Sequence, residues 1–325
     1  MRRESFWNRL PAPFFAMAPM ADVTDAAFRA LVATRGAPDV FWTEFVSADG
    51  LYHTRELGKL PDAENPLMRD LARSADERPI VAQLFSSDPA MIAYATKLVV
   101  GLGFDGVDLN MGCPDKSVER QGCGAAMIRT PEAARAVIRA AREASDLPVS
   151  VKTRVGYNKE SLDEWLPVLL EEAPAAVTLH LRTRKEMSLV PANWELMKKA
   201  VAIRNRANPD VLLIGNGDVT SVEEGKRLAA ETGCDGIMIG RGMFGNPWVF
   251  AGKRSEEVPL SEKLAALVEL SYAFEKLSPP KSFSILKKHI KAFVTGFDGA
   301  AELRARLMEV ETSSELARLL EAGKR

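Results

Sequence analysis

The segment Asn110–Pro114 carries the residues of this chain that are best suited to chemistry. It reads Asn-Met-Gly-Cys-Pro and follows the largely apolar run Gly106–Leu109, which predicts a buried strand. Glycine permits a tight turn there and proline stiffens its exit, so the thiol of Cys113 could attack, ligate a metal or transfer a proton. A free cysteine can also be only a small buried hydrophobe. Its place on a strand-end loop favours the functional interpretation.

Other polar groups also follow apolar runs. Lys152 lies inside the run Val149–Arg154, so we expect its ammonium group to point into a barrel mouth and meet an anion or a ligand carbonyl. His180 alone could equally be a core residue. With Arg182 and Arg184 it would form a cationic rim that suits a phosphate or a nucleic-acid backbone.

Two glycine-containing loops predict a phosphorylated ligand. Gly215-Asn216-Gly217-Asp218 and Gly240-Arg241-Gly242 follow the last two apolar runs. Glycines expose backbone N–H groups to an anion, and Arg241 adds a positive charge. The loops after the last two strands of a barrel commonly bind phosphate, and the recurrence of the motif on both loops strengthens the prediction.

The elements that must position these groups form an alternating pattern. Continuous apolar runs are each followed by a turn and then by a helix-like stretch, which indicates a parallel sheet covered on both faces. Eight such units within about 240 residues predict a (β/α)8 TIM barrel, an α/β fold, since typical barrels have about 250 residues. The runs are Phe14–Met20, Val40–Val46, Ile80–Phe85, Gly106–Asn110, Val149–Arg154, Ala176–Leu181, Val211–Gly215 and Gly236–Ile239.

Four helix starts agree with this register, because each begins with a residue whose side-chain oxygen can cap the first turn. They are Thr24-Asp25, Asp88-Pro89, Thr130-Pro131 and the capping-box pattern Thr220–Glu223. After Phe250 the pattern becomes helical throughout. We therefore expect a barrel over residues 1–250 and a small all-helical domain over residues 251–325.

Composition limits the classes of protein that fit. The chain has 325 residues, 46% of them hydrophobic, with a net charge of −1, so a nucleic acid would have to meet a local basic patch. Three cysteines without a CxxC or zinc-type spacing indicate a reducing compartment and no metal site. Residues 1–10 show no secretory signal, and no run is long enough to cross a bilayer. These features predict a cytoplasmic protein.

The ordered motifs resemble those of the tRNA-dihydrouridine synthase family, from about Phe14 to Phe250. Two residues depart from the family's usual pattern: Leu181, where a small residue is common, and Cys123, where alanine is. The motifs that carry the resemblance are Met17-Ala18-Pro19-Met20, Gln83, Asn110–Pro114, Val151–Arg154, His180–Arg184, Gly215–Asp218 and Gly240–Trp248.

The resemblance implies a flavoenzyme that uses FMN, reduced by NADPH, to convert specific uridines of tRNA to 5,6-dihydrouridine. It implies hydride transfer to C6 of the uracil and proton transfer from Cys113 to C5. The FMN contacts that it implies are Ala18, Pro19 and Met20 at the ring, Gln83 and Lys152 at its polar edge, His180 beside it, and Asn216, Gly217, Asp218, Gly240 and Arg241 at the phosphate.

The same resemblance implies substrate contacts. Asn110 would lie by the uracil, with Arg154, Arg182 and Arg184 as further candidates. We also expect a monomer. In the helical region, Lys281, Lys287, Lys288, His289 and Lys291 could gather on nearby faces of one helix, either as RNA contacts or as an ordinary solvated surface.

Three alternatives remain open from the residues. One is an FMN enzyme that acts on a free pyrimidine, similar to dihydroorotate or dihydropyrimidine dehydrogenases. Another is a colourless barrel isomerase acting on a phosphorylated sugar. The third is an RNA-binding protein without catalysis, which an intact Cys113 and Lys152 disfavour.

Overall fold

A closed barrel of parallel strands forms the larger part of the molecule. The computed structural model describes residues 5–322, and within them eight parallel strands follow the order β1-β8-β7-β6-β5-β4-β3-β2. A parallel bridge between Ala16 and Val40 joins β1 to β2 and closes the ring. The strands are β1 Phe14–Met17, β2 Phe41–Ser47, β3 Ile80–Phe85, β4 Gly106–Met111, β5 Val149–Arg154, β6 Ala176–His180, β7 Leu212–Asn216 and β8 Gly236–Ile239.

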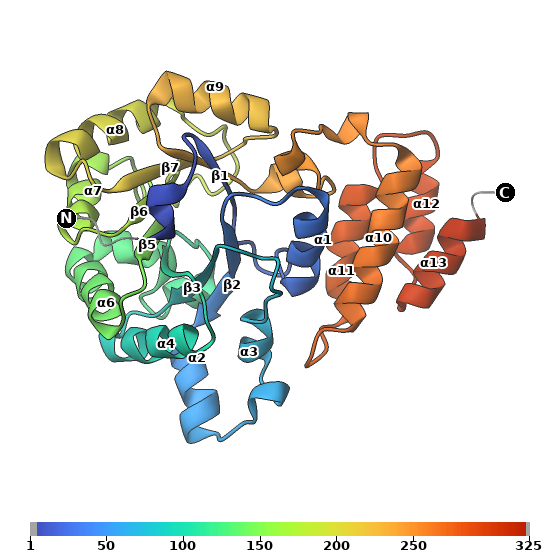
Figure 1. Ribbon diagram of the computed structural model, residues 1–325, viewed down its shortest axis with the longest axis horizontal. Helices are drawn as coiled ribbons and strands as arrows, with labels where there is room; N and C mark the ends of the chain where they lie inside the picture. The colour runs from blue at the N-terminus through green and yellow to red at the C-terminus, as the bar shows by residue number, and fades with distance from the viewer. Residues whose placement is uncertain (1–4, 323–325) are drawn as a thin grey trace.

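Helices alternate with the strands and surround them (Figure 1). The strands are buried on both faces, which explains why they read as continuous apolar runs. The predicted (β/α)8 barrel with helices after it is confirmed. The long outer helices are α1 Ala26–Gly36, α4 Pro89–Gly101, α6 Pro131–Ala144, α7 Leu162–Glu171, α8 Glu195–Ala207 and α9 Val222–Thr232.

The region between β2 and β3 departs from the regular pattern. Short helical pieces replace one outer helix, and in Figure 1 they extend away from the barrel below β2. They are α2 Ala48–Tyr52, the π-helical turn η2 His53–Leu57, η3 Asp62–Glu64 and α3 Pro66–Asp70. Between β4 and α6 lie α5 Lys116–Glu119 and η4 Gly124–Arg129.

Most of the predicted helix starts form the expected caps. Asp25 accepts a hydrogen bond from the backbone N–H of Phe28, Asp88 from that of Ala90 and Ser221 from that of Glu224. Thr130 precedes α6 but makes no side-chain cap. The helix starts at Pro131 because proline is already suited to the first helical position.

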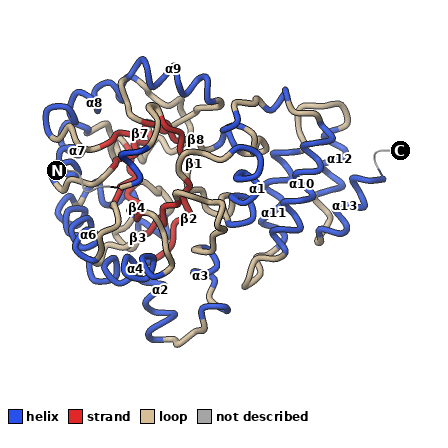
Figure 2. The backbone as a smooth tube through the Cα atoms, viewed as in Figure 1, coloured by secondary structure: helices blue, strands red, loops and turns tan. Residues whose placement is uncertain are grey.

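A helical group lies beside the barrel, next to α1 (Figures 1 and 2). It contains α10 Leu260–Glu275, α11 Phe283–Phe293, α12 Ala300–Leu307 and α13 Ser313–Ala322, and short turns η5 Arg241–Met243, η6 Val249–Ala251 and η7 Ser255–Glu257 lead to it from β8. The division into domains at residues 250 and 251 stays a prediction. No helix among the described residues is both long and apolar enough to span a membrane.

A buried lysine joins the helical group to the barrel. Lys281 precedes α11, its side chain is only 4% exposed, and its Nζ lies 2.7 Å from an Oε2 of Glu44 on β2. The carboxylate of Asp70 is 3.6 Å from the same nitrogen and that of Asp25 is 4.0 Å away. Glu44 in turn accepts from the backbone N–H of Asp22, so the loop after β1 is part of this contact between the helical group and the barrel.

Two residues of α11 complete the same contact. Lys288 pairs with Asp22 at 3.2 Å, and His289 is buried between Phe28 and Phe244 and bonds the backbone of Val23. Burial lowers the pKa of His289 to about 3, so its imidazole is neutral. Lys281 and His289 were expected on a helix surface, either as RNA contacts or as solvated groups, and their buried side chains contradict both alternatives. Whether Lys287 and Lys291 contact RNA stays open.

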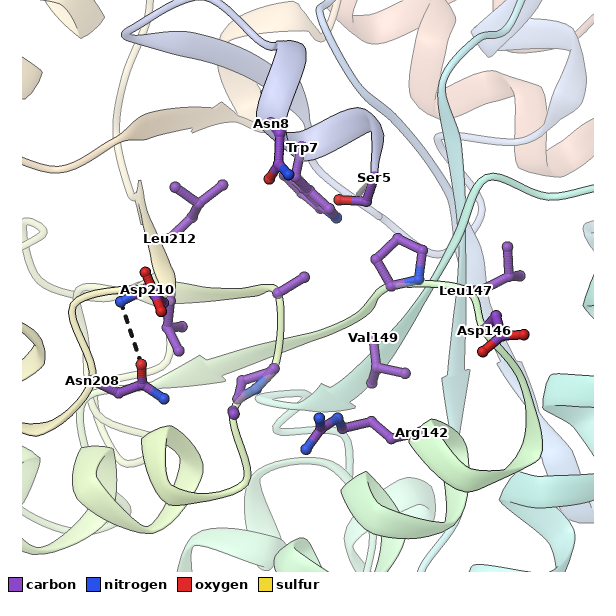
Figure 3. Close-up of a pocket in the computed structure, with 15 residues that line it drawn as sticks. Ser5, Trp7, Asn8, Arg142, Asp146, Leu147, Val149, Asn208, Asp210 and Leu212 are labelled. Carbon is purple, nitrogen blue, oxygen red and sulfur yellow. Dashed lines mark hydrogen bonds between the residues drawn. The ribbon is translucent and has the colours of Figure 1, made fainter. Parts of the chain in front are cut away.

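The N-terminal segment closes the end of the barrel at which the strands begin. Trp7, on the short helix η1 Phe6–Arg9, is buried against Phe14 and Trp42. Beside it a cavity of about 290 Å³ lies at the first residues of β5 and β7 (Figure 3). The N-terminal ends of barrel strands serve stability and not chemistry, so this cavity is set apart from the catalytic end.

We expect Lys281→Met to lower the free energy of unfolding by about 3–5 kcal/mol at neutral pH, because it leaves buried carboxylates without their cation. Burial raises the pKa of Asp25 and of Glu44 even with Lys281 present. Removing the lysine should raise both pKa values further. The loss in free energy of unfolding should therefore become smaller as the pH falls and the two carboxylates protonate. Urea unfolding at several pH values measures this. Lys291→Met, at an exposed position of α11, should match the wild type.

Candidate active site

A cavity of about 570 Å³ opens at the C-terminal ends of the barrel strands. That end is where barrel enzymes place their catalytic groups, and the volume lies within the range of about 300–1,000 Å³ typical of small-molecule sites. Residues from all eight strands or from the loops that follow them line it. They are Ala18, Pro19, Met20, Phe45, Gln83, Asn110, Gly112, Cys113, Pro114, Lys152, Arg154, His180, Arg182, Ser188, Asn216, Gly217, Asp218, Val219, Thr220, Gly240, Arg241 and Gly242.

The cavity brings together every residue predicted from sequence as a site residue except Arg184, which is not among the described residues that line it. Phe45, Ser188, Val219 and Thr220 were not predicted as site residues. Phe45 follows a register shift between β2 and β3, so the alternation of strand residues does not reveal which way it faces. Ser188 lies on an irregular loop whose path has no signal in the sequence.

A chain of hydrogen bonds leads from the barrel interior to the thiol loop. Gln83 Nε2 donates to Asp108 Oδ2 at 2.6 Å, and Asn110 Nδ2 donates to Gln83 Oε1 at 3.0 Å. Asn110 Oδ1 then accepts from the backbone N–H of Cys113 at 2.9 Å and of Gly112 at 3.1 Å. Each amide is thus oriented by the one below it, and Asn110 fixes the start of the thiol loop.

Asp108 is the buried origin of this chain, and no sequence signal marked it. It pairs in register with Gln83 on β3 and Ser150 on β5, and Ser150 Oγ donates to its Oδ1 at 2.6 Å. Burial raises the pKa of Asp108 to about 6, against the lowering effect of hydrogen bonds from Gln83 and Ser150 and of the nearby Lys152. At neutral pH the group is mainly a carboxylate, which holds the Gln83 amide in one orientation.

Lys152 places an ammonium group at the floor of the cavity. It stands beside Asn110 in the β4–β5 register, and its Nζ lies 3.3 Å from Asn216 Oδ1 on β7. Burial lowers its pKa to about 8, and the positive charge of Arg154 acts in the same direction. The amine is therefore mostly protonated at neutral pH, and an anionic ligand in the cavity would stabilise the charged form further.

The Cys113 thiol is held in its protonated form. Burial raises its pKa above the ordinary value, an effect larger than the lowering by the Asp115 backbone N–H. Gly124, at φ +61°, lets the following segment pass so close that a Cβ there would lie 2.6 Å from the Cys113 carbonyl oxygen. A protonated thiol on a fixed loop can donate a proton but is a poor nucleophile until it ionises.

The predicted cationic rim of His180, Arg182 and Arg184 is wrong in its chemistry. Burial lowers the pKa of His180 to about 2, so its ring is neutral at working pH. Arg182 Nη1 lies 3.0 Å from His180 Nε2, which makes that nitrogen the acceptor and leaves Nδ1 as the donor. Arg182 also pairs with Asp218.

Arg184 and Arg154 tie two loops together. Arg184 forms a two-pronged pair with Glu119 of α5 and so contacts the segment after Cys113. Arg154 Nε donates to the carbonyl of Gly112 at 2.8 Å, and its Nη1 donates to that of Met187 at the same distance. These contacts give the arginines a positioning role, because two of the three guanidinium nitrogens of each donate to protein acceptors.

The loops after β7 and β8 form the predicted glycine-lined end of the cavity. Asp218 adopts φ +58° and pairs with both Arg182 and Arg241. A Cβ on Gly217 would lie 2.6 Å from Ala192, and one on Gly240 would project toward Ala18 and Met20 at 3.5 and 3.7 Å. Because glycine has no side chain, a phosphorylated group can approach the backbone of both loops, and the exposed Arg241 lies beside them.

The closed barrel and the polar cavity at its strand ends define a (β/α)8-barrel enzyme. The model of the dihydrouridine synthase family matches residues 16–325. The chain belongs to this family, an oxidoreductase family.

Relatives support the assignment over nearly the whole chain. A probable tRNA-dihydrouridine synthase of Staphylococcus epidermidis is 40% identical over 323 residues, which cover 98% of this chain and 96% of that protein. Probable tRNA-dihydrouridine synthase 2 of Bacillus subtilis is 40% identical over 325 residues, with the same coverage. The alternative of a free-pyrimidine enzyme is not favoured by these relatives.

A solved structure shares the barrel. Histamine dehydrogenase from Rhizobium sp. 4-9 aligns with a TM-score of 0.52 and 14% identity, over 81% of this chain and 49% of that chain. At this identity the likeness concerns the fold alone, and this chain corresponds to about half the length of that protein.

We expect Asn110→Leu to release the thiol loop, because the N–H groups of Gly112 and Cys113 lose their acceptor. Loss of buried hydrogen bonds costs about 1–3 kcal/mol, so alkylation of Cys113 by a neutral maleimide should speed up by about tenfold. Cys123 and Cys234 are only 1% and 6% exposed, so Cys113 dominates the labelling. Asn110→Asp keeps the acceptor oxygen and should label slowly. Equal rates in all three proteins would contradict the positioning role of Asn110.

Proposed function

We propose that this enzyme reduces uridines of tRNA to 5,6-dihydrouridine with FMN in the cavity and NADPH as reductant. The observation that carries the proposal is the half-buried thiol of Cys113, whose backbone N–H is held by Asn110 and which lines the same cavity as Lys152. A weak acid and a buried cation in one cavity suit a reaction that adds a proton to one carbon and a hydride to its neighbour.

The residues present fit a flavin mononucleotide. Gln83 and Lys152 would hold its polar edge, Ala18, Pro19, Met20 and His180 its ring, and the backbone of Asn216, Gly217, Asp218 and Gly240 with Arg241 its phosphate. When bound and reduced, FMN supplies a hydride to C6 of the uracil. The positive charge of Lys152 would favour negative charge at the polar edge of a bound ring, which is how a protein tunes a cofactor.

Cys113 would supply the proton that C5 of the uracil receives. Burial keeps its thiol protonated, so the acid is ready at neutral pH. Asn110 acts on this step by fixing the backbone of Cys113, and its second amide hydrogen remains for the uracil. Neutral His180, with Nε2 already bonded to Arg182, would offer Nδ1–H to the ring or the substrate.

The RNA must deliver a single base into the cavity. A uridine in a loop or a single-stranded segment can leave its stack at a lower cost than one in a duplex. Arg154, Arg182 and Arg184 support this indirectly, by holding the loops around the cavity, because their N–H groups bind protein carbonyls and carboxylates. A monomer in the cytoplasm completes the proposal and rests on the family resemblance and composition.

We expect Cys113→Ala to keep FMN but to lose at least about a hundredfold in turnover, the lower range for loss of a general acid. Cys113→Ser should be severely impaired as well, because a hydroxyl is a much weaker acid. Dihydrouridine formed in unmodified tRNA measures turnover, and flavin absorbance measures retention of the cofactor. Full activity of Cys113→Ala would remove the thiol from the mechanism.

Turnover should also fall as the pH rises through about 8. Lys152 loses its proton there, since burial has lowered its pKa to that value, and a neutral amine cannot stabilise an anionic ligand. Lys152→Met should be slow and should lack this inflection. A wild-type profile that is flat between pH 7 and 9 would mean that the charge of Lys152 does not matter for the reaction.

Position-resolved mapping of dihydrouridine in tRNA from cells with and without this protein tests the proposal as a whole. Loss of dihydrouridine at defined sites supports it. Unchanged tRNA, with activity of the purified yellow protein on free uracil or dihydroorotate, would establish the free-pyrimidine alternative instead.

A further inference from the structure

The loop between β6 and α8 presents an unusual set of exposed apolar side chains. Seven large hydrophobic residues are exposed within the described part of the chain, and three of them fall within four consecutive positions of this loop. Leu189 is 84% exposed, Met187 44% and Val190 40%. Single exposed leucines are ordinary, but a cluster on one short segment indicates a contact surface. We call Met187–Val190 the apolar tip.

The apolar tip stands at the edge of the cavity. Ser188, its second residue, lines the cavity together with Cys113 and Asn110. Arg154 donates both to the carbonyl of Gly112 on the thiol loop and to that of Met187, so the tip lies beside the thiol loop. Lys185, three residues before Ser188 on the same loop, is exposed and adds a positive charge.

Buried arginines hold the tip at both ends. Arg154 donates to the carbonyl of Met187 at 2.8 Å, and Arg182 donates to the carbonyl of Val190 at 2.6 Å. The N–H of Leu189 also bonds the carbonyl of Glu186 at 2.9 Å. A loop fixed in this way loses little conformational freedom on binding, so its apolar side chains form a preorganised surface.

We propose that the apolar tip packs against the RNA bases that flank the uridine entering the cavity, and that Leu189 fills the space that this base leaves. The inference rests on the proposed function, because it needs an RNA with one base extruded. Apolar side chains inserted beside unstacked bases recover part of the lost stacking, and they do so on any sequence. Lys185 would meet the phosphates next to them.

The test compares Leu189→Ser with Leu189→Met and with the control Leu57→Ser. Leu57 is also strongly exposed, at 61%, but lies on η2 and does not line the cavity. We expect kcat/KM for unmodified tRNA to fall by about tenfold in Leu189→Ser, within the range for loss of one base-stacking contact. Leu189→Met and Leu57→Ser should stay near the wild type. Unchanged melting temperatures confirm that all the variants fold.

The rate of flavin reduction by NADPH without RNA serves as a second readout. It should be equal in all four proteins, because the inference assigns the tip to RNA alone. Wild-type kcat/KM in Leu189→Ser would overturn the inference and leave the proposed function intact. A wild-type enzyme that turns over no RNA would overturn the proposed function itself. A concentration-dependent dimer in sedimentation, lost in Leu189→Ser, would assign the tip to a second copy of the chain and also overturn the inference.

Discussion

The hydrogen bonds from Asp108 through Gln83 and Asn110 to the backbone of Cys113 set the geometry on which the cavity depends. The side chains of Asp108, Gln83 and Asn110 are buried, so loss of one of them would leave a buried polar group of its neighbour without a partner. The parallel register of β3, β4 and β5 places these side chains next to one another. The barrel therefore does more than support the thiol: it orients the loop that carries it.

Sequence reasoning predicted the barrel and most of the cavity for one physical reason. Parallel strands buried on both faces read as apolar runs, and polar residues at their ends must meet at one end of the barrel. Cys113, Lys152 and the loops at Gly217 and Gly240 follow from that rule. Phe45 and Asp108 do not follow from it. Phe45 comes after a shift in strand register, and Asp108 bonds another buried side chain, and neither feature can be recognised in the sequence.

The charged residues show the limit of such reasoning most clearly. Arg184 pairs with Glu119, and Lys281 with Glu44, across sequence separations of 65 and 237 residues. A spacing rule cannot find partners so far apart. Arg184 was therefore a candidate for substrate contact and Lys281 was left between RNA contact and a solvated surface, whereas both bind carboxylates of the chain itself. Burial then removed His180 and His289 from the set of positive groups. The sequence shows which groups can be charged, but burial and ion pairing decide whether they are charged and what they bind.

The packing of Trp7 against Phe14 and Trp42 has a practical consequence. It seats the first described helix at the end of the barrel where the strands begin, opposite the large cavity at the strand ends. A fusion partner or surface anchor attached ahead of Ser5 thus starts on the side away from catalysis. An immobilised enzyme joined there keeps its entrance facing the solution.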